Sequence, residues 1–289
     1  MKIYSVVGEK GGSGKTRLNL GISCQFACRP TGGKVLLIDG SDNQGTLSFM
    51  YARKIDERGC GLGCAIEQVL AGLSGNRIKS VLQEGMQRVY IDAGEIYHID
   101  ILAAAHKSLG KLSHKPWKEK EPGEVLSIVL EVLYKEYDYC VIDLKPDLDS
   151  TTVKSTLSIA DKIILLQDVE LLENIAGLAE WIDVCSQVSK EGSRVIAGIV
   201  ANKYNAKVAA SKEALAYVQG ACDANRMPLL TIIPNMHGIM ANIGGRWETE
   251  SGEIATGPIS AMAAGPVPSR KYYQALMKQF DLICEALEA

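Results

Sequence analysis

Short, continuous apolar runs recur along the chain and alternate with longer segments that have helical periodicity. The runs predict strands at 2–7, 34–39, 97–102, 138–143, 162–167, 194–201 and 229–233. The intervening pattern predicts helices at 15–28, 63–73, 122–135, 150–159, 171–189, 209–223 and 269–287. Continuous apolar runs are typical of parallel strands that are buried on both faces. We therefore expect an α/β fold with a doubly wound, mostly parallel sheet, helices on both faces, and a site at the carboxyl ends of the strands.

A glycine-rich stretch connects the first predicted strand to the first predicted helix, and it reads Lys10-Gly11-Gly12-Ser13-Gly14-Lys15-Thr16. Its backbone N–H groups can close around phosphate oxygens, Lys15 adds a positive charge, and the Thr16 hydroxyl suits Mg²⁺. The helix that starts at Lys15 presents its positive dipole end to an anion. The sequence therefore predicts a nucleotide phosphate site, with Gly11, Gly12, Ser13, Gly14, Lys15, Thr16 and Arg17 as candidate binding residues.

One position of this phosphate loop departs from the ordinary pattern. Glu9 stands where that pattern has its first glycine, and a second lysine, Lys10, follows it. This variant resembles the deviant phosphate loop of the ParA/MinD family of P-loop ATPases. The resemblance extends over nearly the whole chain, with less precision after residue 235. It implies a homodimer with ATP sandwiched at the interface, in which Lys10 reaches across to the phosphates held by the partner subunit.

Strand ends that match the family imply the rest of the nucleotide site. The stretch 33–39 is similar to the family's second strand, which ends in an aspartate near Mg²⁺, here Asp39. The stretch 137–143 is similar to its Walker B strand, which delivers Asp143 to the metal. Asn202 matches the residue that reads the adenine edge, and Pro234 is a further candidate nucleotide contact. The resemblance thus implies ATP and Mg²⁺ as cofactors, with Thr16, Asp39 and Asp143 at the metal.

The first switch of this chain differs from the family pattern of aspartate, any residue, aspartate, proline, glutamine. It reads Asp39-Gly40-Ser41-Asp42-Asn43-Gln44-Gly45, with serine at the place of the second aspartate. Either the loop carries one extra residue and Asp42 orients the attacking water, or hydrolysis is weak. We favour Asp42, because Gln44 and Gly45 are displaced by the same single residue and Gly40 can absorb the added turn. The catalytic candidates are Lys10, Lys15, Asp39 and Asp42.

The resemblance implies a partition ATPase of the ParA type that acts in plasmid or chromosome segregation. In its ATP state such a protein binds DNA nonspecifically, and a small DNA-binding adaptor of the ParB type stimulates its slow hydrolysis. The candidate DNA contacts are Lys203, Lys207 and Arg246. One alternative is a membrane-cycling or cargo-positioning ATPase of the MinD type, although the acidic predicted C-terminal helix is expected to pack on the core rather than on a membrane. Another is a metal-cofactor carrier that uses Cys24, Cys28, Cys60 and Cys64.

The composition of the chain bears on its domain organisation, its DNA binding and its cellular compartment. The chain has 289 residues, of which 47% are hydrophobic, and this is enough to bury one full core. We expect a single P-loop ATPase domain over 1–289, with an irregular segment at 235–268 and an exposed connection at 107–122. The net charge of −3 argues against a general attraction to nucleic acid, so DNA binding requires a local basic patch. The eight cysteines suit a reducing compartment, and no run approaches the ~20 apolar residues of a membrane span. We expect a cytoplasmic protein that is nucleoid-associated in its ATP state.

Overall fold

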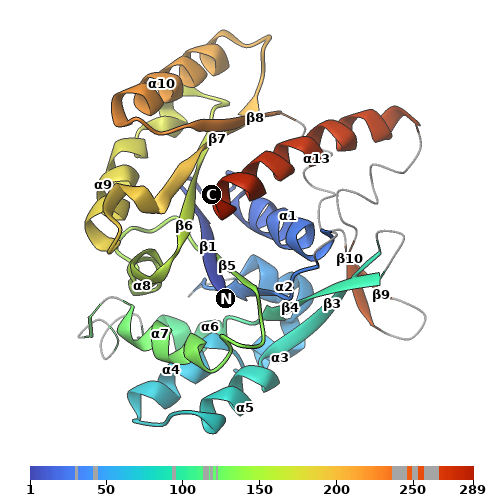
Figure 1. The fold of residues 1–289 in the computed structure, drawn as a ribbon, viewed down its shortest axis with the longest axis vertical. Helices are drawn as coiled ribbons and strands as arrows, with labels where there is room; N and C mark the ends of the chain where they lie inside the picture. The colour runs from blue at the N-terminus through green and yellow to red at the C-terminus, as the bar shows by residue number, and fades with distance from the viewer. Residues whose placement is uncertain are drawn as a thin grey trace.

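The computed structural model describes residues 1–29, 32–41, 45–92, 96–112, 117, 120–121, 123–235, 246–248, 253–256 and 267–289. Within them, a ten-stranded sheet forms the centre of the molecule (Figure 1). Its strands are β1 (Lys2–Val7), β2 (Val35–Asp39), β3 (Met86–Asp92), β4 (Ile96–Leu102), β5 (Tyr139–Asp143), β6 (Lys162–Asp168), β7 (Ile196–Tyr204), β8 (Leu229–Pro234), β9 (Arg246–Glu248) and β10 (Ile254–Thr256).

The order of the strands across the sheet is β8-β7-β6-β1-β5-β2-β4-β3-β10-β9. Every neighbouring pair from β8 to β4 is parallel, whereas β3 is antiparallel to β4 and β9 is antiparallel to β10. Since β1 lies between β5 and β6, its carboxyl end meets the carboxyl ends of the strands on both sides. The prediction of a doubly wound, mostly parallel sheet is confirmed.

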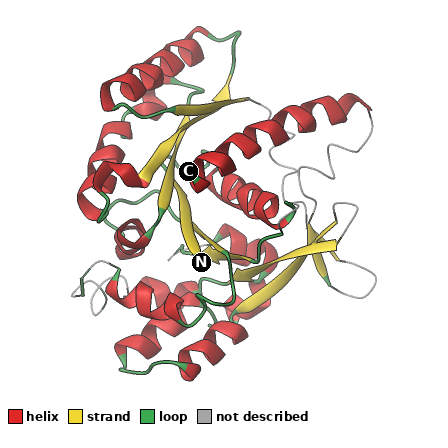
Figure 2. Ribbon diagram, in the orientation of Figure 1, coloured by secondary structure: helices red, strands yellow, loops and turns green. Residues whose placement is uncertain are grey.

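Helices cover both faces of the sheet (Figure 2). They are α1 (Lys15–Ala27), α2 (Thr46–Tyr51), α3 (Arg53–Glu57), α4 (Leu62–Leu70), α5 (Asn76–Glu84), α6 (His106–Leu112), α7 (Glu124–Glu131), α8 (Thr151–Ile159), α9 (Leu178–Val188), α10 (Ala209–Asn225) and α13 (Val267–Glu288), with 3₁₀ turns η1 (Leu172–Ile175) and η2 (Gly192–Val195). Alternate residues of β2 point to opposite faces: Leu36 and Ile38 belong to the core that includes residues of α4 to α10, and Val35 and Leu37 belong to the core that includes residues of α1, α2 and α13. This division produces a core on each side of the sheet.

The C-terminal helix α13 lies alongside α1, the helix that follows the phosphate loop (Figure 1). Phe280 and Ile283 of α13 are fully buried. A Cβ added to Gly21 of α1 would lie 2.2 Å from the Phe280 ring, so glycine permits the close approach of the two helices. The expected packing of this helix on the core is confirmed, and it holds α1 against the sheet.

Several elements were absent from the sequence prediction: α2, α3, α5, α6, β3, β9 and β10. The expectation of an exposed connection at 107–122 is wrong for its first part, because 106–112 form α6 and Leu109, Leu112 and Trp117 are buried. These three apolar residues are scattered among lysines, so their pattern resembles a polar loop until the fold brings them to the core. The predicted helix at 171–189 is divided into η1 and α9. The break comes at Gly177, whose N–H donates to a Glu9 carboxylate oxygen at 2.6 Å.

Among the described helices, none has the length and apolar character needed to cross a membrane. The described residues contain no group of three or more His, Cys, Asp or Glu side chains that could hold a metal ion, and all eight cysteines are free thiols. Cys24 is fully buried on α1, which accords with a structural thiol.

Candidate functional site

The phosphate loop connects β1 to α1 at the centre of the sheet. Gly12 and Gly14 have φ values of 76° and 102°, in the region that favours glycine. A Cβ on Gly14 would also lie 2.8 Å from the Asn202 side-chain nitrogen. The Asn202 Nδ2 donates to the Ser13 carbonyl at 2.7 Å, so the end of β7 supports the loop. The described geometry thus explains why glycine is needed at Gly14.

Lys15 lies beneath this loop with only 6% of its surface exposed. Its Nζ donates to the Lys10 carbonyl at 2.7 Å and to the Ser13 hydroxyl at 3.2 Å. Burial lowers the pKa of the Lys15 ammonium to about 8, and the nearby Asp143 partly opposes that shift. The ammonium therefore sits in a weakly solvated position at the loop, where an anion is strongly favoured.

Asp143, at the end of β5, is held by two donors from α1. The Thr16 hydroxyl donates to its Oδ2 at 2.7 Å, and the Asn19 Nδ2 donates to its Oδ1 at 2.7 Å. Thr16 and Asp143 were both predicted for the metal site, whereas Asn19 was not predicted. A polar residue one turn after Lys15 on an otherwise apolar helix face was the signal that could have identified it.

Asp39 ends β2 in register with Asp143, but its carboxylate contacts other groups. It accepts the Ser41 N–H at 3.1 Å, and the Ser48 N–H and hydroxyl each at 2.8 Å. The Ser48 hydroxyl in turn accepts the Ala104 N–H at 2.9 Å. Asp39 thus anchors the start of α2 behind the first switch, and its role at a metal stays a prediction. Asp42, the candidate for orienting water, lies outside the described residues.

A cavity of about 380 Å³ opens beside the phosphate loop. Its other walls are formed by Ser41 of the first switch with Thr46, and by residues 144–146 after β5, which belong to a second switch that spans 143–147. Its lining residues are Gly11, Gly12, Gly14, Lys15, Thr16, Arg17, Ser41, Thr46, Asp143, Leu144, Lys145 and Pro146. In the second switch, the Lys145 ammonium pairs with Asp147 at 2.9 Å. The cavity brings together the predicted phosphate-binding and metal-binding residues except Asp39 and Ser13.

Lys10 is the first residue of the loop, and its side chain belongs to a separate polar network. Its Nζ donates to the Asn174 Oδ1. The Asn174 Nδ2 donates to one oxygen of the buried Asp168 at 3.1 Å, and the Lys203 ammonium pairs with the other at 2.6 Å. The two lysines of the phosphate loop are therefore used differently: Lys15 faces the loop interior, and Lys10 contacts η1.

The remaining candidate residues are Asn202 and Pro234 for the nucleotide and Lys203, Lys207 and Arg246 for DNA. The Asn202 Oδ1 is buried without a hydrogen-bond partner among the described residues, so it is an available acceptor in the nucleotide region. Pro234 ends β8 beside Tyr204. Lys207 is exposed, whereas Lys203 is engaged by Asp168. The side chain of Arg246 lies outside the described ones.

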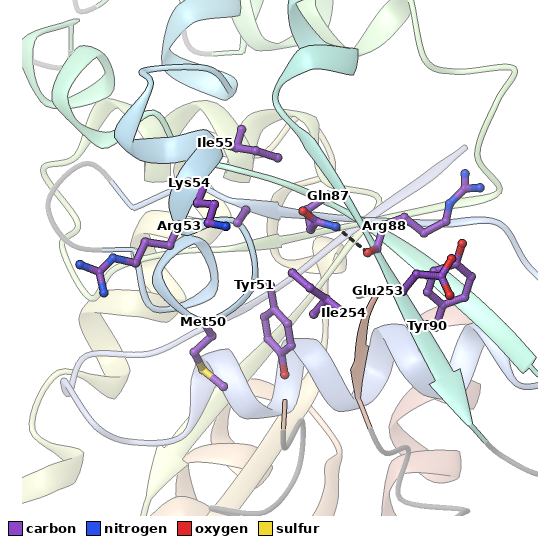
Figure 3. Close-up of a pocket in the computed structure, with 11 residues that line it drawn as sticks. Met50, Tyr51, Arg53, Lys54, Ile55, Gln87, Arg88, Tyr90, Glu253 and Ile254 are labelled. Carbon is purple, nitrogen blue, oxygen red and sulfur yellow. Dashed lines mark hydrogen bonds between the residues drawn. The ribbon is translucent and has the colours of Figure 1, made fainter. Parts of the chain in front are cut away.

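A larger cavity of about 490 Å³ lies between α2–α3 and the strands β3 and β10 (Figure 3). Its two arginines already have acidic partners: Arg53 pairs with Glu57 at 2.8 Å, and Arg88 pairs with Asp100 at 3.0 Å. Its lining includes no residue of the phosphate loop. The groups that can bind a nucleotide therefore lie at the smaller cavity.

Burial and the charge of Asp39 raise the pKa of the Asp143 carboxyl from 3.8 to about 7. The folded protein binds this proton more tightly than the unfolded chain, so protonation of Asp143 raises the free energy of unfolding. This contribution is complete below the ordinary pKa of 3.8 and is lost as the pH rises through about 7. We expect the thermal midpoint in EDTA to fall between about pH 4 and pH 7, and to fall less in Asp143→Asn. Asp149→Asn, which changes a fully exposed carboxylate, is the matched control. Identical pH profiles for the wild type and Asp143→Asn would refute the assignment.

Known proteins resemble this chain in sequence and in fold. A family model described as AAA domain matches residues 1–197. A virulence plasmid ParA family protein of Chlamydia trachomatis, pGP5-D, is 30% identical over 196 residues, which cover 66% of this chain and 64% of that protein. The aligned part of this chain thus spans less than two thirds of the length of that relative.

Three solved structures illustrate the likeness in fold. Apo McdA from Cyanothece has a TM-score of 0.69 at 18% identity, covering 99% of both chains. A putative plasmid partition protein from Borrelia burgdorferi B31, bound to AMPPNP, has a TM-score of 0.61 at 17% identity, covering 96% of this chain and 97% of that one. A cobyrinic acid a,c-diamide synthase from Mycobacterium smegmatis, with bound ATP analogue and magnesium, has a TM-score of 0.63 at 20% identity, covering 82% and 86%. At these identities the structures show the fold alone.

The residues that the family model matches include every residue that lines the cavity beside the phosphate loop. The chain belongs to the AAA domain family of ParA/MinD-like P-loop ATPases.

Proposed function

We propose that this chain is an Mg²⁺-dependent ATPase of the ParA type, formed by one P-loop domain over 1–289, which dimerises around ATP and acts in DNA partition. The proposal rests on one observation: the side chains of the two loop lysines, Lys10 and Lys15, have different positions and partners. The Lys15 side chain is buried against the loop backbone, whereas the Lys10 side chain contacts Asn174 of η1. The ParA family relative, and the partition protein crystallised with AMPPNP, support this reading.

The oxygen donors beside the loop fit Mg²⁺. Mg²⁺ prefers hard oxygen ligands and keeps several waters, and the Thr16 hydroxyl and the Asp143 carboxylate supply such oxygens at the cavity. Thr16 and Asp143 would hold the ion, with Asp39 behind them, and the ion would offset charge on the β- and γ-phosphate oxygens. Lys15 and the loop N–H groups bind the phosphates, and the Asn202 Oδ1 accepts from the adenine amino group.

Dimer formation and hydrolysis use residues outside the loop interior. Lys10 leaves Asn174 and reaches the phosphates held by the partner subunit, while Asp42 orients the attacking water. Lys10 would offset the negative charge that develops on the phosphoryl oxygens in the transition state, and Asp42 would hold the attacking water in position. A ParB-like adaptor stimulates the slow turnover. The protein works in the cytoplasm and, in its ATP state, on the nucleoid.

Nonspecific DNA binding is the activity that distinguishes partition from membrane cycling. Lys207 is an exposed cation just before α10, and Arg246 is a further candidate. Lys203 is a weaker candidate than its sequence position suggested, because its ammonium pairs with the buried Asp168. The apolar side of α13 is packed on α1, which supports a DNA partner over a membrane.

We expect the ATP-bound protein to bind unrelated DNA duplexes with similar affinity that falls steeply with salt, because phosphate contacts release counterions. Lys207→Ala is expected to weaken binding to all duplexes and to reduce the salt slope by about 1. Fluorescence anisotropy on two unrelated duplexes over a range of salt concentrations measures both effects. The control is Lys190→Ala, which removes an exposed lysine beyond the end of α9. A strong preference for one duplex, or no binding at low salt, would contradict the DNA proposal.

A further inference from the structure

We infer that Asn19 is a positioning residue of the Mg²⁺–nucleotide site, which acts through Asp143 on the hydroxyl of Thr16. The inference rests on the proposed function, because it concerns the metal of that same site. Asn19 is not among the residues that line the cavity, and its side-chain hydrogen bonds go to Val6 and Asp143, of which only Asp143 lines the cavity. Its influence must therefore pass through the carboxylate.

Both the oxygen and the nitrogen of the Asn19 side-chain amide have hydrogen-bond partners. Asn19 has no exposed surface. Its Oδ1 accepts the Val6 N–H at 3.1 Å, and its Nδ2 donates to the Asp143 Oδ1 at 2.7 Å. Turning the amide over would place nitrogen against the Val6 N–H and oxygen against the carboxylate, so one orientation alone satisfies both neighbours. A single side chain thus connects β1, α1 and β5 at the point where the phosphate loop begins.

This contact determines which oxygen of Asp143 is left for Thr16. Because the Asp143 Oδ1 is occupied by Asn19, Oδ2 receives the Thr16 hydroxyl hydrogen at 2.7 Å. A hydroxyl that donates its hydrogen to the carboxylate turns its lone pairs away from it, and Thr16 lines the cavity. The Thr16 oxygen is therefore oriented as a cation ligand before a metal arrives. Without Asn19, the carboxylate can rotate and this orientation is lost.

Ser23 provides a matched control on the same helix. It lies one turn beyond Asn19, it is equally buried, and its hydroxyl donates to the Asn19 carbonyl at 2.8 Å. Ser23→Ala therefore removes a buried polar group from α1 without changing a donor to Asp143. Any effect of Asn19→Ala that arises only from lost polarity in the helix is expected in Ser23→Ala as well.

The test is a titration of fluorescent ADP binding, first in EDTA and then at rising Mg²⁺ concentrations, for the wild type, Asn19→Ala and Ser23→Ala. ADP is used so that dimer formation does not enter the measurement. We expect Asn19→Ala to require about tenfold more Mg²⁺ for the same binding, which is the usual effect of removing a group that orients a metal ligand. Its ADP affinity in EDTA is expected to equal that of the wild type, and Ser23→Ala is expected to match the wild type in both conditions.

An unchanged Mg²⁺ requirement in Asn19→Ala would overturn the inference, as would an equal loss of ADP affinity with and without Mg²⁺, because a purely structural role affects both alike. Asn19→Ser, which removes less volume, is measured in parallel with thermal unfolding and must show the same raised Mg²⁺ requirement at a wild-type melting temperature. ADP binding by the wild type that does not respond to Mg²⁺ would instead contradict the proposed function, and this inference with it.

Discussion

Replacing Lys15 with alanine is expected to weaken nucleotide binding by about two to three orders of magnitude, effectively abolishing it. Lys15 is buried at the phosphate loop, and burial has already lowered the pKa of its ammonium to about 8. Loss of one partner from a buried charge pair costs about 3–5 kcal/mol, and each 1.4 kcal/mol is about tenfold in affinity. The remaining backbone N–H groups cannot replace a full charge in a weakly solvated site.

Isothermal titration calorimetry with ADP and Mg²⁺ measures this loss. Lys34→Ala is the control. Lys34 is exposed and directly precedes β2, so it lies at the amino ends of the parallel strands, whereas the phosphate loop lies at their carboxyl ends. Thermal unfolding of both variants separates a change of binding from a change of stability. An affinity for ADP within a few-fold of the wild type in Lys15→Ala would show that the loop is not the phosphate site.

The second large effect is expected from Lys10→Ala, which should prevent ATP-dependent dimerisation and leave nucleotide binding by the monomer nearly intact. The Lys10 ammonium contacts Asn174, whereas the phosphate loop is closed by the Lys10 carbonyl, which every residue type provides. Removing the side chain therefore leaves the contacts of Lys15 in place. It takes away the charge that we propose the partner subunit uses.

Light scattering in the presence of a non-hydrolysable ATP analogue and Mg²⁺ measures the dimer, and calorimetry with ADP measures binding. Asn174→Ala is the matched control, since it removes the same contact from the other side and keeps the lysine. We expect Asn174→Ala to dimerise at least as well as the wild type. Dimerisation of Lys10→Ala like the wild type would contradict the role of this lysine across the interface.

Local patterns in the sequence were sufficient to predict the parallel strands of the sheet and the phosphate loop. The buried strands are continuous apolar runs, and the glycines of the loop stand in the order that a phosphate cradle requires, so neighbouring residues carry the information. The polar partners of the site could not be read in the same way. Ser48 holds Asp39 from nine positions away, and Asp168 engages Lys203 across the β6–β7 pair. The first pairing depends on the path of the β2–α2 connection and the second on strand order, and single-sequence patterns leave both open.

The elements that the prediction missed share a physical cause. Strand β3 is partly exposed and has two consecutive polar residues, Gln87 and Arg88, before the buried Val89 and Ile91, and α3 has only five residues. Trp117 carries a buried aromatic side chain within a lysine-rich stretch. In each case the tertiary contact, rather than the local pattern, decides the structure.

Sedimentation velocity of the wild-type chain tests the central claim most directly. The chain is measured with Mg²⁺ and a non-hydrolysable ATP analogue, and again with Mg²⁺ and ADP. We expect twice the monomer mass with the ATP analogue and the monomer mass with ADP, because only the γ-phosphate gives Lys10 of each subunit a contact on the other. The same mass with both nucleotides would contradict an ATP-dependent dimer and with it the ParA-type function proposed for this chain.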